Sequence, residues 1–225
     1  MFNFNKNTII LVVASVAIII GFLYLVFTTS NTPTQSKSYK VAKEVFKTDH
    51  IKWSPDKKIV LVEYSDFQCP NCKLWNDFFK QLEKSNSPEF KKIAEKVTFI
   101  YRNFPLETIH KNGLAASYTA EAAGLQGKFY EMHDLLFEKQ AEWSVIKDPT
   151  NFFIGLSKSL KLDSEKFKID ITSSDVKKKV EADKASGNQA NVNSTASFYL
   201  NGVYLDKLNS TQDLLNILLK EVNSK

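Results

Sequence analysis

Apolar and polar residues follow one another along this chain in patterns that predict a mixed α/β protein. Residues 59–64 form an apolar, β-branched run between polar turns, which predicts a buried strand. After residue 72, apolar side chains recur at helical spacing, while Asn76, Lys80 and Lys84 occupy the opposite face. The sequence therefore predicts a strand that is followed directly by an amphipathic helix.

The same patterns continue to the end of the chain. A short helix is predicted at residues 88–93 and a strand at 97–101, which gives a βαβ unit. The later part is expected to be mostly helical and to end in a hairpin and a helix. The predicted elements are helices at 109–123, 128–140, 152–159 and 175–190, strands at 197–200 and 203–204, and a helix at 211–222.

The segment 8–27 contains twenty uncharged residues, about the length that crosses a hydrocarbon core. We interpret it as a retained transmembrane anchor after an N-terminal flank at 1–7, with a cleaved signal peptide as the alternative. Lysines on both sides leave the orientation open by the charge rule. A polar linker is expected at 28–45 and a single domain at 46–225.

Composition places the domain among globular proteins and argues against a nucleic-acid partner. The chain has 225 residues, is 43% hydrophobic and carries a formal charge of +5. Lysine supplies nearly all of this positive charge, because Arg102 is the single arginine, and the lysines are spread along the chain. We interpret the basic balance as a solvated surface.

The chain has two cysteines, and both lie in the motif Cys69-Pro70-Asn71-Cys72 at the junction of the predicted strand and helix. Free N–H groups and the dipole at a helix N-terminus favour a thiolate, so Cys69 is the expected nucleophile. Pro70 suits the first turn of a helix. Cys72 lies one turn further and is expected to be the resolving thiol of a redox pair.

Four segments of the chain together resemble the DsbA-like family of thiol:disulfide oxidoreductases. They are residues 62–72, 102–106, 120–137 and 198–202. The resemblance implies a thioredoxin fold in which a helical domain, here at about 106–190, is inserted as a lid beside the dithiol. It also implies that Cys69 and Cys72 are the redox cysteines.

Glu63 stands six residues before Cys69, where similar family members keep a buried acid beneath the site. As such an acid it would exchange protons with Cys72. The alternative is a strand carboxylate that faces water or pairs with a lysine, and burial distinguishes the two interpretations.

The chain departs from the family motif in the loop that faces the dithiol. The family reads Gly-Val-x-Gly-Thr-Pro-Thr with a cis proline, whereas residues 191–197 place Ala196 at the proline position. Since a cis bond costs about 2.5–4 kcal/mol before a non-proline residue, we predict a trans Thr195–Ala196 bond. A trans bond would move Thr195 away from Cys69 and weaken the pairing with substrate.

Other kinds of site are less consistent with the sequence. A zinc site would need further ligands, and His50, His110 and His133 are widely spaced, so we expect no metal or other cofactor and assign the histidines to surface or packing positions. Two glycosylation tripeptides, at 193–195 and 209–211, are treated as incidental.

These features predict a membrane-anchored thiol:disulfide oxidoreductase outside the cytoplasm, in the bacterial periplasm or at the cell surface. It would donate the Cys69–Cys72 disulfide to exported protein thiols and be reoxidised by a membrane redox partner. The alternatives are a reductase or isomerase of the same fold, and a peptide-binding or chaperone-like module with weakened redox function. A purely stabilising disulfide is disfavoured, because so small a loop removes little chain entropy.

Overall fold

The computed structural model describes residues 15–24 and 37–224. The contacts between residues divide the chain into two compact units, Met1–Gln35 and Ser36–Lys225. Residues 15–24 are helical, and the helices in the described ranges include none that is both long and apolar enough to span a membrane. Of the predicted anchor at 8–27, residues 8–14 and 25–27 lie outside the described part of the chain.

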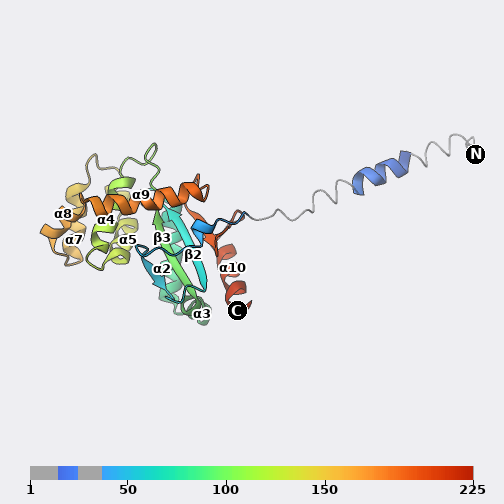
Figure 1. The fold of residues 1–225 in the computed structure, drawn as a ribbon, viewed down its shortest axis with the longest axis horizontal. Coiled ribbons are helices and arrows are strands. Elements are labelled where there is room, and N and C mark those ends of the chain that lie inside the picture. Colours follow the sequence, from blue (N-terminus) through green and yellow to red (C-terminus); the bar gives the residue numbers. More distant parts are fainter. Residues whose placement is uncertain (1–14, 25–36, 225) are drawn as a thin grey trace, which may run out of the picture. The chain divides into compact units, whose positions relative to one another are not determined.

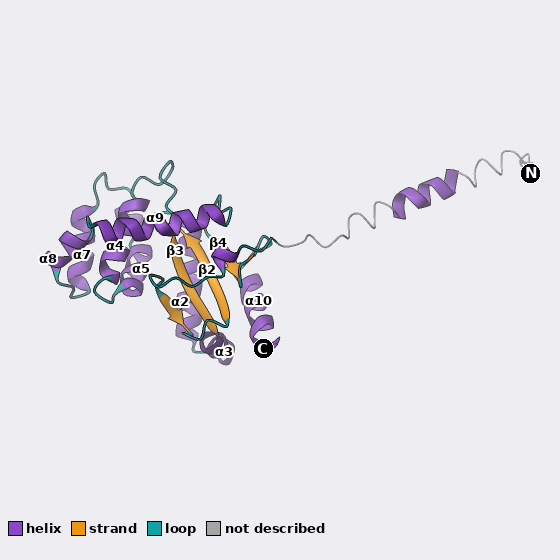
Figure 2. Ribbon diagram, in the orientation of Figure 1, coloured by secondary structure: helices purple, strands orange, loops and turns teal. Residues whose placement is uncertain are grey.

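A five-stranded mixed sheet forms the centre of the second unit (Figure 1, Figure 2). The strands are β1 (Ile51–Trp53), β2 (Ile59–Ser65), β3 (Val97–Asn103), β4 (Ser197–Leu200) and β5 (Val203–Tyr204), in the order β1-β3-β2-β4-β5. β2 runs parallel to β3 and antiparallel to β4, and both β2 and β3 are buried along their whole length. Because both strands are buried, both of their faces are covered by the rest of the domain. The parallel pairing of β2 with β3 confirms the predicted βαβ unit.

Three helices pack with one face of the sheet. They are α2 (Pro70–Ser85), α3 (Pro88–Lys96) and α10 (Thr211–Ser224). Their buried side chains join those of Leu61, Phe99 and Tyr101 in one core. Val62 and Ile100 point the other way, into a second core, because successive side chains of a strand face opposite sides. Side chains at odd-numbered positions of β2 and β3 thus face α2.

Six helices are inserted between β3 and β4, within the predicted range 106–190. They are α4 (Gly113–Gly124), α5 (Phe129–Glu138), α6 (Gln140–Trp143), α7 (Thr150–Ser159), α8 (Ser164–Asp170) and α9 (Ser174–Gln189). α8 was not predicted, although the Asp163 side chain caps its first turn by accepting from two backbone N–H groups. α9 returns to the sheet, where the Asp183 carboxylate accepts from the N–H of Asn103 at the end of β3 (Figure 1).

The segment 37–45 packs on the domain, so the predicted linker boundary at residue 45 is wrong. The N–H of Tyr39 donates to Gly202 O at 2.7 Å, and the short helix η1 (Lys40–Ala42) places Ala42 in the second core. Arg102 Nη1 also donates to Val41 O. The prediction of a linker used the polar composition of this segment. The tertiary contacts that hold the segment on the domain leave no periodic pattern in the sequence, so they could not be predicted.

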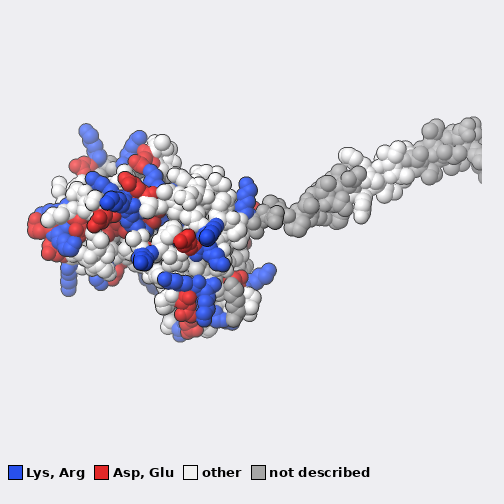
Figure 3. All heavy atoms as spheres, viewed as in Figure 1, with Lys and Arg blue, Asp and Glu red and all other residues white. Residues whose placement is uncertain are grey.

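A buried charged cluster joins this N-terminal segment to the sheet and to α9. The Arg102 guanidinium binds both carboxylate oxygens of Asp49, at 3.2 and 2.8 Å, and both side chains are fully buried. Lys179 lies 2.5 Å from Asp183 and 3.8 Å from Asp49. Lysines elsewhere are interspersed with acidic side chains over the inserted helices (Figure 3), which agrees with a solvated basic surface.

Candidate active site

Cys69 is the N-cap residue of α2, at the point where the chain leaves β2 and turns into the helix. Its backbone is extended (φ −76°, ψ 124°), and Pro70 follows in the first turn. The N–H of Cys69 donates to Asp66 O at 3.0 Å. The strand and helix predicted on either side of the motif thus place the first sulfur beside the free N–H groups of α2.

The Cys69 thiol is 7% exposed and is set up to ionise. A hydrogen bond from the Cys72 thiol lowers the pKa of Cys69 to about 5, together with the N–H groups of Cys72 and Asn71 and against the effect of burial. The Cys69 sulfur also lies 3.4 Å from Thr195 O. At pH 7 this thiol is a thiolate, the form that attacks a disulfide.

Cys72 lies in the opposite kind of environment, although it is only one turn away. It is fully buried, and the N–H of Asp66 donates to its sulfur at 3.4 Å. Burial raises the pKa of Cys72 well above its ordinary value, and the negative charges of Cys69 and Glu63 raise it further. The structure therefore pairs one ionised, slightly exposed thiol with one protonated thiol that is fully buried.

Glu63 lies on β2 beneath the dithiol, on the face that packs against α2. It is 3% exposed, which favours the interpretation as a buried acid over that of a strand carboxylate in water. Burial raises the pKa of Glu63 to about 8, the Ser65 hydroxyl opposes this rise, and the charge on Cys69 adds to it. At pH 7 the carboxyl group holds a proton.

The Thr195–Ala196 peptide bond is cis, so the prediction of a trans bond is wrong. That prediction used only the intrinsic cost of the bond and left out the contacts of the surrounding loop. Thr195 is 8% exposed, its carbonyl oxygen faces the Cys69 sulfur, and Ser197 Oγ donates to Ser194 O at 2.8 Å. Thr195 is therefore beside Cys69 and not displaced from it.

A family model described as thioredoxin matches residues 45–220, which is most of the chain. The chain belongs to this thioredoxin family. Its second unit contains the inserted helices and the dithiol at the start of α2 that the sequence predicted.

Several solved structures of similar fold are named as thiol-disulfide exchange proteins or related proteins. Oxidised BdbD from Bacillus subtilis has a TM-score of 0.66 at 22% identity, covering 84% of this chain and 97% of that one. α-DsbA1 from Wolbachia pipientis has a TM-score of 0.65 at 18% identity, with 80% and 94% covered. A protein-disulfide isomerase from Novosphingobium aromaticivorans has a TM-score of 0.62 at 19% identity, with 80% and 100% covered. The fold of this chain is DsbA-like.

Curated relatives match the chain over only part of their own length. A protein named Na(+)/H(+) antiporter NhaA 1 from Mycobacterium sp. (strain KMS) is 32% identical over 158 residues, which are 68% of this chain and 24% of that protein. A protein of the same name from Salinispora arenicola is 30% identical, with 68% and 22% covered. The chain spans about a quarter of the length of these relatives.

A groove of about 270 Å³ runs beside the dithiol of this thioredoxin-family domain. Its walls come from the start of α2, the loop at Ala196 and the turn before α10, and they include Asn71, Leu74 and Trp75. Leu74 is 64% exposed at its edge. The groove therefore lies between α2 and the loop at Ala196, with polar and apolar side chains in its walls.

The sequence predictions misplaced one residue near the dithiol, Asn76, and assigned no role to another, Asp66. Asn76 is 4% exposed, so the prediction that it lies on the polar face of the helix is wrong. The Asp66 carboxylate is fully buried and accepts from the N–H groups of Gln68 and Leu106, each at 2.8 Å, and lies 2.7 Å from His110 Nδ1. Leu106 and His110 belong to the inserted region, so periodicity and spacing give no sign of their contacts with Asp66.

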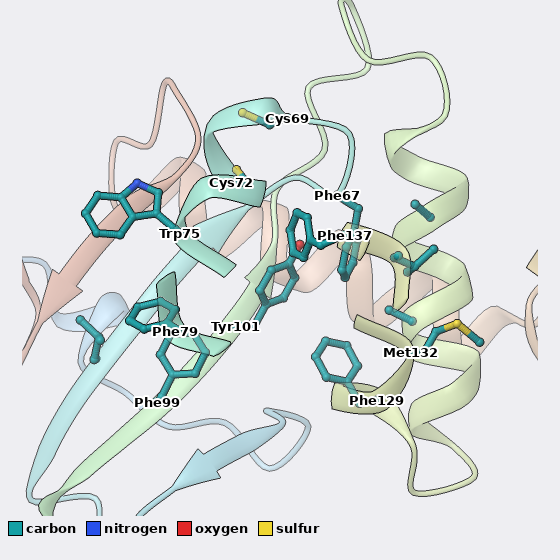
Figure 4. Close-up of a cluster of buried hydrophobic side chains, with 14 of the residues drawn as sticks. Phe67, Cys69, Cys72, Trp75, Phe79, Phe99, Tyr101, Phe129, Met132 and Phe137 are labelled. Atoms are coloured by element: carbon teal, nitrogen blue, oxygen red, sulfur yellow. The ribbon is translucent and has the colours of Figure 1, made fainter. Parts of the chain in front are cut away.

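The described ranges contain no group of three or more His, Cys, Asp or Glu side chains arranged to hold a metal ion. His50 Nε2 lies 2.7 Å from Glu121 and His110 contacts Asp66. His133 is 4% exposed, and its ring packs edge-on against Tyr101 at 4.7 Å. Figure 4 shows the side chains of Cys69 and Cys72 at the start of α2, with the rings of Phe67 and Tyr101 nearby.

Proposed function

We propose that this protein is a thiol:disulfide oxidoreductase that donates its Cys69–Cys72 disulfide to the thiols of exported proteins. The observation that carries the proposal is the contrast between the two sulfurs at the start of α2. Cys69 is ionised and slightly exposed, and Asn71 and Ala196 beside it line a groove, whereas Cys72 is protonated and fully buried. Such a pair suits exchange through a mixed disulfide on the outer sulfur.

The proposed reaction begins when a substrate thiolate attacks the Cys69 sulfur of the oxidised protein. Cys72 leaves and takes up a proton, for which the protonated Glu63 beneath it is the source. A second substrate thiolate then attacks the substrate sulfur of the mixed disulfide, and Cys69 leaves as a stable thiolate because its pKa is about 5. A low pKa at Cys69 thus favours donation of the disulfide.

A reductase or isomerase of the same fold is the second candidate. Asn71 occupies the position at which the strongly oxidising DsbA site has histidine, and an amide offers a hydrogen bond but no positive charge. This substitution supports a potential between that of thioredoxin, about −270 mV, and that of DsbA, about −120 mV. The fraction of Cys69 and Cys72 oxidised in intact cells, trapped with a thiol-alkylating reagent that adds mass, decides the direction. Mostly reduced protein would contradict a disulfide donor.

A peptide-binding module is a further candidate, because the groove at Ala196 lies beside the dithiol. The two classes of function separate in a pair of variants. Cys69→Ala removes the nucleophile and leaves the groove, so a redox enzyme loses all its activity in the host. Cys72→Ser should accumulate mixed disulfides with exported proteins, since the resolving thiol is gone. Full activity of Cys69→Ala would favour peptide binding alone.

We place the domain outside the cytoplasm, in the periplasm or at the cell surface, anchored through residues 8–27 and served by a membrane redox partner. The uncharged character of that segment and the restriction of cysteine to one redox pair support this placement. An anchored protein should stay with the membrane fraction in high salt. Recovery of a shortened, soluble form from the native host would instead indicate a cleaved signal peptide.

A further inference from the structure

Buried polar atoms without hydrogen-bond partners gather around the dithiol. In the part of the chain that the structure describes, five buried side-chain atoms lack a partner, and four of them belong to residues near the two cysteines. They are Ser65 Oγ, Asn76 Nδ2, the Tyr101 hydroxyl and Thr195 Oγ1. Each such atom costs about 1–3 kcal/mol, so a group of them calls for a functional explanation.

The Tyr101 hydroxyl is the donor best placed to act on the inner sulfur. Tyr101 lies directly opposite Glu63 in the β2–β3 register, and both side chains face α2. Its ring stacks on Phe67 at 4.9 Å. Figure 4 shows the side chain rising from β3 toward the end of the sheet where Cys72 and Phe67 lie.

The electrostatics of the Tyr101 hydroxyl agree with the position that the strand register and Figure 4 give it. Burial raises the pKa of Tyr101 well above its ordinary value, and among the negative charges that add to this effect Cys72 contributes most, ahead of Glu63 and Asp66. His133 packs on the edge of the same ring. The nearby Ser65 hydroxyl opposes the rise in the pKa of Tyr101. The Tyr101 hydroxyl is therefore a buried donor in the same group of residues as the sulfur that must become negative during exchange.

We propose that the Tyr101 hydroxyl donates a hydrogen bond to the Cys72 sulfur as that sulfur leaves the disulfide. This inference rests on the proposed function. The substrate thiolate forms a bond to the Cys69 sulfur, the Cys69–Cys72 bond breaks, and its electron pair remains on Cys72. The substrate sulfur is oxidised and Cys72 is reduced, after which Cys72 takes a proton from Glu63, which regains one from solvent.

A donor used only at this stage accelerates the reaction without stabilising the resting protein. The sulfur of a neutral disulfide is a weak acceptor, whereas a departing thiolate is a strong one. Interactions that are stronger in the transition state than in the ground state raise the rate. In the structure both cysteines are free thiols, and the Tyr101 hydroxyl makes no hydrogen bond to the neutral Cys72 sulfur.

The test is Tyr101→Phe, which keeps the ring and removes a hydroxyl that has no partner in the folded protein. The oxidised variant is mixed with dithiothreitol in a stopped-flow instrument, and the appearance of protein thiols is followed. We expect reduction about tenfold slower than in the unsubstituted protein. The pH midpoint of Cys69 ionisation and the reduction potential should not change, because the hydroxyl acts on Cys72 alone.

Tyr130→Phe is the matched control. Tyr130 is half-buried, and its hydroxyl already donates to His50 O at 2.7 Å, so this variant should react at the full rate. An unchanged rate in Tyr101→Phe, or a slower rate accompanied by a shifted Cys69 midpoint, would overturn the inference. If the unsubstituted disulfide does not exchange with dithiothreitol at all, the proposed function itself fails.

Discussion

The backbone N–H of Asp66 points at the sulfur of Cys72, 3.4 Å away. The carbonyl oxygen of Asp66 accepts from the N–H of Cys69, so one residue fixes both ends of the dithiol. Its carboxylate in turn accepts from Gln68 and Leu106 and contacts His110. The position of the two sulfurs thus depends on an acid that is buried behind them.

Asp66→Asn should destabilise the domain and disturb the dithiol. An amide places an NH₂ group against one of the N–H donors, which leaves buried donors facing each other and costs about 2–3 kcal/mol. Denaturant unfolding measures the change. Asp77→Asn is the control, because Asp77 is 45% exposed in a surface pair with Lys73 and should change the stability by less than about 0.5 kcal/mol. Equal effects of the two variants would contradict this role for Asp66.

The ionisation of Cys69 should depend on the side chain at position 72. The largest cause of its low pKa is the hydrogen bond from the Cys72 thiol. Cys72→Ser keeps a donor, so the thiolate absorbance of Cys69 should still titrate near pH 5, whereas Cys72→Ala should move the midpoint upward. Identical midpoints in the two variants would mean that the helix N-terminus alone acidifies Cys69.

Glu63→Gln should stabilise the protein increasingly as the pH rises from about 4.5 to about 8. The folded pKa is about 8, against an ordinary value of 4.5, so in this window the unfolded chain releases a proton that the folded protein keeps. Glu63 therefore removes stability as the pH rises, by about 1.4 kcal/mol per unit, and Gln abolishes this loss.

The free energy of unfolding of both proteins, measured at pH 5 and pH 7, tests this prediction. The disulfide form is used, because its sulfur atoms do not ionise in this pH range. Because the disulfide form lacks the Cys69 charge that adds to the pKa of Glu63, the gain at pH 7 should be at most about 3 kcal/mol, and the gain at pH 5 below about 1 kcal/mol. Glu95→Gln, on the exposed face of α3, should show no such trend. A gain that does not vary with pH would mean that Glu63 is ionised in the folded protein.

Asn71→His should raise the reduction potential. A protonated imidazole beside Cys69 stabilises the thiolate and so favours the reduced form, by about 30 mV for each 1.4 kcal/mol. Equilibration with glutathione buffers measures the reduction potentials of the unsubstituted protein and of Asn71→His. If the reduction potential of the unsubstituted protein already equals that of DsbA, Asn71 does not lower this potential.

The sequence predicts those elements whose side chains follow a local period. The apolar run of β2 and the helical spacing after Cys72 define the core of the site, and the predicted strands 97–101 and 197–200 match β3 and β4. The three-residue β1 and the short α8 were not predicted, because so few residues establish no period. The burial of Asn76 was mispredicted, because a polar residue in a helix is placed in solvent unless a tertiary partner is known.

The tertiary features of the site depend on contacts between distant parts of the chain. The contact of His110 with Asp66 and the place of Thr195 beside Cys69 are of this kind. The cis bond before Ala196 was mispredicted for the same reason, since an isolated peptide bond says nothing about the loop around it.

The buried charged cluster also bears on the order in which the domain can fold. Asp49 and Arg102 are synthesised well before α9, which carries Lys179 and Asp183. Until α9 arrives, these early charges lack part of their final set of partners and remain better solvated outside a closed core. The sheet and the inserted helices should consequently become protected from proteases together, and only after the chain has passed α9.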